Sequence, residues 1–306
     1  MSEGESARPW RAGSDDEIVE LAKTWLHSDA LDELMTALGG PTAASPPAAL
    51  QAWTAANLDT RGGAERRDAP SVNWRSAWSE ALVRADAPLG LITTAPPSQI
   101  YYDAALVLGG ATTGNRLRVA LTHQLISSGC RFGEIVGLTT DRELGARELA
   151  SEPDAAADHT EARNLLRYLE AAFGPLRAVA AEAGSDHGET TASWRDEHFT
   201  GSDGVNLRLV VAPGPPGTRA TTTDAIDFYL GRSALRTRES TLVVTSAIYA
   251  PYQFFATAPR LLGDGATTVE LVGTPTAQDD VATLAQRVGQ EIHAAVDAAS
   301  RLITGG

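Results

Sequence analysis

From Tyr101 onward, short apolar runs alternate with longer segments in which apolar residues recur every three to four positions. Short continuous runs are typical of strands buried in a parallel sheet, and the longer segments are typical of amphipathic helices. The predicted strands are 104–110, 134–140, 176–183, 205–213, 241–247 and 267–273. The predicted helices are 115–129, 158–174, 221–234, 249–262 and 279–303. This alternation predicts an α/β fold: a Rossmann-like, doubly wound, mainly parallel sheet with helices on both faces.

Residues 1–100 have a different pattern, in which helical spacing dominates and no strand is predicted. Apolar residues recur near helical spacing from Ile18 to Leu34, and Gly39–Gly40 ends that segment. Further helices are predicted at 48–58 and 73–85. We therefore expect a helical extension or cap over 1–100, followed by a Rossmann-like ligand-binding domain over 101–306.

One polar, Gly-rich segment, 184–204, separates the third and fourth predicted strands. Trp194 stands near its centre, between stretches typical of loops. We interpret this segment as an insertion into the domain, either a surface hairpin or a mobile lid.

Charge and composition narrow the range of partners and chemistries. The net charge of −14 disfavours nucleic acids and anionic membranes, which bind clustered lysine and arginine. Lys23 is the only lysine, so a phosphate loop of the GxxxxGK[ST] type and a Schiff-base lysine in 101–306 are excluded. Cys130 is the only cysteine, which excludes intramolecular disulfides. With no apolar span and no secretory leader, we expect a cytoplasmic protein; a homo-oligomer stays open.

The first predicted strand ends in a glycine-rich turn. Gly109 and Gly110 allow a tight backbone and close approach of a ligand, and a helix is expected to begin near Asn115. The free N–H groups of a helix N-terminus attract anions, and Arg116 and Arg118 add positive charge. The spacing is not GxGxxG, so no dinucleotide fingerprint is present. A plain strand-to-helix turn is the alternative interpretation.

The other strand ends carry polar residues that would face the same edge of the sheet. Thr160 and Glu161 open the second helix, and simple helix capping would also explain them. Glu161 is the candidate catalytic acid or base, because burial and nearby arginines tune the protonation of a carboxyl group. The remaining candidate ligand-binding residues are Arg219, Thr221, Thr222, Thr223, Thr245, Ser246 and Tyr249.

Four of these segments resemble the ordered motifs of the YdcF/SanA-type domain family (ElyC/SanA/YdcF-like proteins). They are LVLGG followed by NRLRVA, then TEARNLLRYLEAAFG, RATTTDA and VVTSAIYAPYQF, within roughly residues 100–275. The resemblance implies a Rossmann-type fold; one bacterial member binds S-adenosylmethionine, and others are linked to cell-envelope functions. Carried over by position, it points to Gly109, Gly110, Arg116, Thr160, Glu161, Arg219, Thr221, Asp224, Thr245 and Ser246.

Two positions depart from the family pattern. Tyr249 stands where the family usually has histidine, and Tyr252 where it usually has arginine. If those residues handle a proton or an anion in relatives, the chemistry of this chain differs from theirs.

These observations give three functional hypotheses. The first is an enzyme, a hydrolase or transferase, acting on a small nucleotide-like or phosphorylated metabolite, with specialised metabolism as one setting. The second is a non-catalytic binding or sensor protein for S-adenosylmethionine or a related adenosyl compound; the bound cofactor would then be S-adenosylmethionine or a nucleotide. The third is an interaction role for residues 1–100. No metal site is predicted, because the histidines match no ligand spacing.

Overall fold

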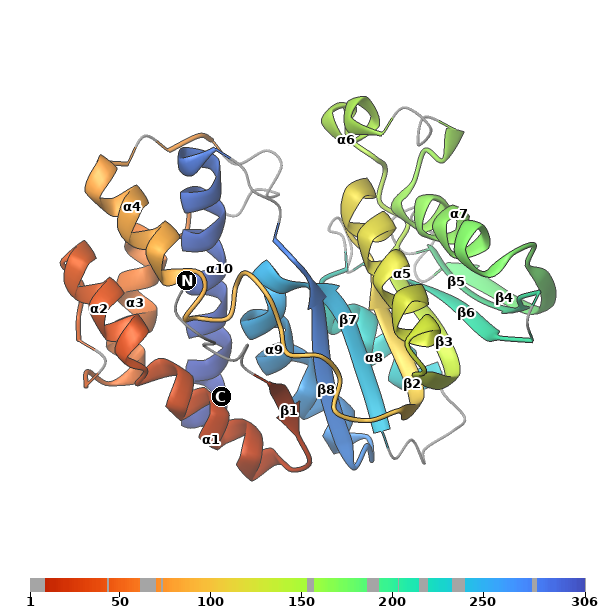
Figure 1. Cartoon of the computed structure of the whole chain (residues 1–306), viewed down its shortest axis with the longest axis horizontal. Helices are drawn as coiled ribbons and strands as arrows, with labels where there is room; N and C mark the ends of the chain where they lie inside the picture. The colour runs from red at the N-terminus through yellow and green to blue at the C-terminus, as the bar shows by residue number, and fades with distance from the viewer. Residues whose placement is uncertain are drawn as a thin grey trace. The chain divides into compact units, whose positions relative to one another are not determined.

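The computed structural model describes residues 9–42, 44–60, 70–72, 74–152, 157–185, 193–202, 204–214, 220–232, 240–276 and 280–305. The chain divides into two compact units (Figure 1). The first comprises Met1–Ala95, Ala247–Ala256 and Pro275–Gly306, and the second comprises Pro96–Ser246 and Thr257–Thr274.

The first unit is a group of helices built around the last helix of the chain. Its elements are β1 (Trp10–Ala12), α1 (Asp15–Leu26), α2 (Asp29–Leu38), α3 (Pro47–Asn57), α4 (Ser76–Ala85), η4 (Ala247–Tyr249), the first half of α9 (Ala250–Gly263) and α10 (Val281–Thr304). α10 packs against α1, α3 and α4. From the sequence, this last helix was expected to belong to the sheet-containing domain 101–306. In the structure it belongs to the same unit as the N-terminal helices.

The apolar periodicity between residues 15 and 38 belongs to two helices rather than one. Ser28 interrupts it, because its Oγ accepts a hydrogen bond from the backbone N–H of Leu31 and so caps α2. Gly39 ends α2 in the left-handed conformation (φ 76°), as the sequence predicted. The short strand β1 was not predicted, since three residues carry too little pattern to detect.

The second unit contains the sheet. Its elements are β2 (Tyr101–Leu108), α5 (Thr112–Ser127), β3 (Arg131–Thr140), α6 (Ala146–Ser151), α7 (Glu161–Phe173), β4 (Arg177–Ser185), β5 (Ser193–Thr200), β6 (Asn206–Ala212), α8 (Thr222–Arg232), β7 (Ser240–Ser246) and β8 (Thr268–Thr274). Its strand order is β8-β7-β2-β3-β6-β5-β4. Neighbours from β8 to β6 are parallel, and β5 is antiparallel to both β6 and β4. The predicted Rossmann-like α/β fold with a mainly parallel sheet is confirmed.

The order of the strands creates a switch point beside β2. The chain runs from β2 to β3 on one side and later returns to β7 on the other side. α5 and α7 pack together and against β2 and β3 (Figure 1). Apolar side chains of these strands, including Ala105, Val107 and Ile135, form the core with Leu165 and Leu169 of α7. In folds of this kind, ligands bind outside the carboxyl ends of the strands near the switch.

The sequence suggested that segment 184–204 is an insertion into the domain, but part of the segment is a strand of the sheet. Residues Ser193–Thr200 form β5, which pairs with β4 and β6 and is therefore an integral strand. The third predicted strand corresponds to β4, which is antiparallel and largely exposed rather than buried and parallel. Of the two interpretations of the segment, the hairpin fits the antiparallel pairing of β4 with β5.

A buried ion-pair cluster fastens α8 to the antiparallel end of the sheet. Arg208 donates two hydrogen bonds to Asp196, from Nε to Oδ1 at 2.7 Å and from Nη2 to Oδ2 at 2.6 Å. Arg232, the last residue of α8, donates from Nε to Asp196 Oδ2 at 3.3 Å and lies 3.9 Å above the centre of the Trp194 ring. Burial alone would raise the pKa of Asp196, but the hydrogen bonds and charge of Arg208 and the hydrogen bond from Arg232 lower it.

Candidate functional site

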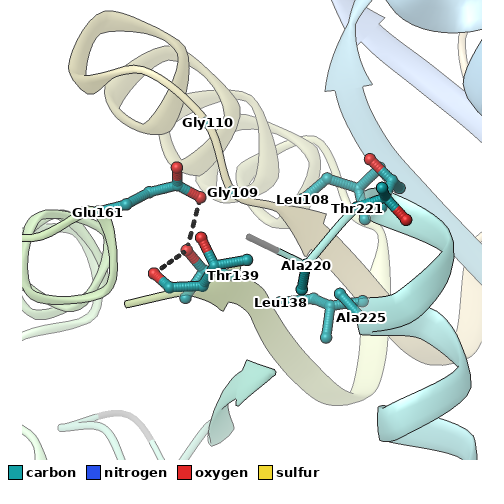
Figure 2. Close-up of a pocket in the computed structure, with 11 residues that line it drawn as sticks. Leu108, Gly109, Gly110, Leu138, Thr139, Glu161, Ala220, Thr221 and Ala225 are labelled. Carbon is teal, nitrogen blue, oxygen red and sulfur yellow. Dashed lines mark hydrogen bonds between the residues drawn. The ribbon is translucent and has the colours of Figure 1, made fainter. Parts of the chain in front are cut away.

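A pocket lies at the carboxyl ends of β2 and β3, beside the beginnings of α7 and α8 (Figure 2). Its volume is about 50 Å³. The lining residues are Leu108, Gly109, Gly110, Leu138, Thr139, Thr140, Glu161, Ala220, Thr221, Thr222 and Ala225. The structure thus brings together four groups of residues that lie far apart in the sequence.

Glu161 places a buried carboxylate in this pocket. It is the first residue of α7, and only 4% of it is exposed. Its Oε1 accepts a hydrogen bond from Thr139 Oγ1 at 2.8 Å, and its Oε2 accepts one from Arg142 Nε at 2.9 Å. Figure 2 shows the Glu161 and Thr139 side chains pointing toward one another. The carboxylate is therefore held in one position from two sides.

The capping of α7 is done by Thr160, not by Asp158 as the predicted start at 158 implied. Thr160 Oγ1 accepts from the backbone N–H of Arg163 at 3.3 Å. Capping therefore explains Thr160 but does not require the side chain of Glu161, which faces the pocket instead.

Arg142 links Glu161 to a second carboxylate. Its Nη1 and Nη2 donate to the two oxygens of Glu148 at 2.7 and 2.8 Å. Burial alone would lower the pKa of the Arg142 guanidinium, but the hydrogen bonds and charges of Glu148 and Glu161 raise it above its ordinary value. Arg142 therefore stays charged between two carboxylates. No sequence pattern indicates this role, because the three residues meet only after the β3–α7 connection has folded.

Gly109 stands directly against the carboxylate. A Cβ atom at this position would lie 2.5 Å from Thr139 Oγ1 and 2.6 Å from Glu161 Oε1, which is closer than such atoms approach. The backbone N–H of Gly109 donates to Leu138 O at 2.7 Å, which ties the ends of β2 and β3 together. Only glycine fits here, so the glycine-rich turn predicted from the sequence serves the packing of Glu161.

We expect Gly109→Ala to displace the Thr139–Glu161 pair and to lower the free energy of unfolding by about 1–3 kcal/mol, as overpacking does. Chemical denaturation of the purified variant measures this loss. Gly231→Ala in α8 is the matched control, because nothing lies within 4 Å of the added Cβ. That control should be neutral or slightly stabilising, since alanine favours helix. Equal stability of both variants would contradict the close packing at Gly109.

Arg118, rather than Arg116, lies under the glycine turn. Arg118 is 2% exposed, and its Nη1 donates to Leu108 O at 2.6 Å and to Gly109 O at 2.7 Å. Its Nε donates to Ser246 Oγ at 3.2 Å, so it spans the switch point between β2 and β7. Arg116 instead pairs with Glu152 at 2.9 Å, and its side chain is 47% exposed.

Asn115 joins helices instead of lining the pocket. It is fully buried in α5, which begins at Thr112, three residues before the predicted start. Asn115 Nδ2 donates to Asn164 Oδ1 at 3.0 Å, and Asn164 Nδ2 donates to Asp158 Oδ2 at 2.9 Å. This chain of amides packs α5 against α7.

The predicted threonine cluster lies at the beginning of α8, and two of its three members line the pocket. Thr221 and Thr222 line the pocket, and Thr223 Oγ1 lies 2.8 Å from Thr221 Oγ1. Thr221 also donates from its backbone N–H and from Oγ1 to Asp224 Oδ2, both at 2.7 Å. Arg219 lies outside the described residues.

The residues predicted after the fifth strand are placed apart from this lining. Thr245 is fully buried within β7, and Ser246 receives the hydrogen bond from Arg118. Tyr249 ends η4 and belongs to the first unit.

The charge of the lining is negative. Among the described residues that line the pocket, Glu161 is the one charged side chain, and none is basic. Within the ranges that the structure describes, no group of three or more His, Cys, Asp or Glu is arranged to hold a metal ion. No helix among the described residues is long and apolar enough to cross a membrane.

Comparisons with known proteins leave the site to be interpreted from its own geometry. No family model, no curated protein and no solved structure matches the chain. The resemblance to the YdcF/SanA-type family therefore stays a prediction.

Proposed function

We propose that the chain is an enzyme that binds a small nucleotide-like or phosphorylated metabolite at this pocket and uses Glu161 as a base. The observation that carries the proposal is the buried Glu161 carboxylate, fixed by Thr139 and Arg142 on the wall of a pocket at the strand ends. In its ion pair with Arg142, Glu161 is an ionised carboxylate, which accepts hydrogen bonds and donates none. Such a group suits the abstraction of a proton from a bound hydroxyl or water.

The immobilisation of Glu161 also supports a base that is ready before the ligand arrives. Arg142 is itself held by Glu148, whose Oε2 accepts from the backbone N–H of Gly145 at 2.8 Å. The backbone N–H of Gly145 therefore holds Glu148, Glu148 holds Arg142, and Arg142 holds Glu161. A base held in this way loses little conformational freedom when it reacts.

A binding or sensor protein for S-adenosylmethionine or a related adenosyl compound is the second candidate. The observation that favours it is that both oxygens of Glu161 already accept hydrogen bonds. A carboxylate with this support can anchor the hydroxyls of a ligand without taking up a proton. The two candidates share the pocket and differ only in turnover.

A ligand screen followed by Glu161→Gln tests the proposal. Thermal shift with nucleotides, sugar phosphates and S-adenosylmethionine identifies binders, and mass spectrometry of the incubated mixture detects turnover. We expect at least one compound to bind and to be converted, and Glu161→Gln to reduce conversion by about 10²-fold or more while binding persists.

The control for this experiment is Glu152→Gln, which removes a carboxylate from the exposed pair with Arg116 and should leave conversion unchanged. Binding without conversion in the wild-type protein would favour the sensor candidate. If no compound raises the melting temperature, the proposed ligand class is wrong.

A further inference from the structure

Glu161 and Thr139 offer acceptors rather than donors to the pocket, whereas the buried hydroxyl of Thr140 has no hydrogen-bond partner among the described residues and can donate as well as accept. A carboxylate has about four acceptor positions, so Glu161 keeps room for further donors after binding Thr139 and Arg142. Thr139 uses its single hydroxyl hydrogen on Glu161, so toward a ligand its oxygen can only accept. A ligand group that fits Glu161 and Thr139 must therefore donate hydrogen bonds, and one that also accepts, as a hydroxyl does, can pair with Thr140.

At the beginning of α8, on the opposite wall, some of the hydrogen-bond donors are already engaged. The backbone N–H and the hydroxyl of Thr221 both donate to Asp224 Oδ2, and the N–H of Asp224 donates to Thr221 Oγ1 at 3.2 Å. The N–H groups of a helix N-terminus would otherwise attract phosphate, but here two are engaged and a carboxylate stands beside them. Asp224 adds negative charge beside the beginning of α8, and Glu161 adds it on the pocket wall itself.

The size of the pocket selects among the donor groups of a nucleotide-like ligand. About 50 Å³ accommodates roughly three or four water-sized groups. This is room for a pair of sugar hydroxyls. A phosphate group would fit by size, but its negative charge would be repelled by Glu161.

We propose that the pocket binds the sugar hydroxyls of the ligand, with Glu161 accepting their hydrogen bonds and the phosphate remaining outside the pocket. This inference rests on the proposed function, because it assigns an orientation to a nucleotide-like or phosphorylated ligand. It also means that the pocket selects among ligands by the hydroxyl groups that the sugar carries. Thr139 is then a positioning residue, since it acts by orienting the carboxylate.

The test compares matched ligands that differ only in a sugar hydroxyl. Isothermal titration of the full chain uses adenosine monophosphate and ribose 5-phosphate, each with its 2-deoxy counterpart, and inorganic phosphate alone. In the wild-type protein we expect loss of the hydroxyl to weaken binding by about 10- to 100-fold, as for a hydrogen bond to a charged group. Inorganic phosphate should not compete for the pocket.

Two variants separate this orientation from a general effect on folding. Glu161→Gln should bring the ratio of ribose to deoxyribose affinities toward one. Thr139→Val, which keeps the Glu161–Arg142 pair and nearly the same volume, should reduce the ratio without abolishing binding. A ratio that both variants leave at its wild-type value would overturn the role of Glu161.

The outcomes distinguish this inference from the function on which it rests. If ribose and deoxyribose compounds bind equally and inorganic phosphate competes with them, phosphate occupies the pocket; the inference then fails while the proposed function stands. If none of the five probes binds and the wider screen is also negative, both the proposed function and this inference fail.

Discussion

Replacing Arg142 with methionine is expected to lower the free energy of unfolding by about 3–5 kcal/mol, the usual effect of leaving a buried charge without its partner. The substitution keeps the apolar stem of the side chain but removes the guanidinium that both Glu148 and Glu161 contact. The side chains of these carboxylates are only 12% and 5% exposed, so water can replace the lost partner only in part. Two carboxylates are then left facing each other, which adds repulsion to desolvation.

Arg116→Met is the matched control, because Arg116 also pairs with a glutamate of the β3–α7 connection. That pair is exposed on the arginine side, so its loss should cost less than about 1 kcal/mol. Urea denaturation of the wild type and both variants, followed by circular dichroism, measures the difference. A loss at Arg142 no larger than that at Arg116 would show that the buried pairs do not hold the site together.

Replacing Asp196 with alanine is expected to be destabilising by a similar amount, about 3–5 kcal/mol. Arg208 is 4% exposed and loses both hydrogen bonds of its bidentate pair, and Arg232 loses its contact as well. The exposed pair of Asp227 and Arg260, 3.0 Å apart, provides the control. Asp227→Ala should change stability by less than about 1 kcal/mol.

The pH dependence of stability gives an independent check on Asp196. Its pKa is lower in the folded protein than the ordinary value of 3.8. The resulting stabilisation is complete above the unfolded pKa and is lost as the pH falls through the folded pKa. Wild-type stability should therefore decline below about pH 4. The decline should be smaller in Asp196→Ala, because this variant lacks the contribution of Asp196. Equal slopes of the free energy of unfolding against pH in the wild type and in Asp196→Ala would contradict the lowered pKa of Asp196.

The sequence predicted the parallel part of the sheet well because its strands are continuous apolar runs. β2, β3 and β7 are buried on both faces, and their hydrophobic side chains stand out from the helices around them. β5 was missed for the opposite reason. Its sequence, SWRDEHFT, is polar, since its buried residue Asp196 forms an ion pair instead of an apolar contact. Hydrophobic patterning cannot detect a strand that is packed in this way.

Part of the candidate site was also visible in the sequence. Gly109, Gly110, Glu161, Thr221 and Thr222 were named from their positions after strands or at helix starts, and all five line the pocket. Arg142 was not assigned a role, because its partners are set by how loops and helices pack. Arg118 lies two residues from the predicted Arg116, and only the orientation of α5 decides which arginine reaches the glycine turn.

The placement of α10 has a consequence for biosynthesis. α1, α3 and α4 all pack against this helix, yet more than 190 residues separate α4 from α10 along the chain. A ribosome therefore exposes the apolar faces of the N-terminal helices well before their common partner is translated, whereas every strand of the parallel sheet precedes α10. The sheet unit can mature during elongation, but the helical unit closes only after α10 has been translated.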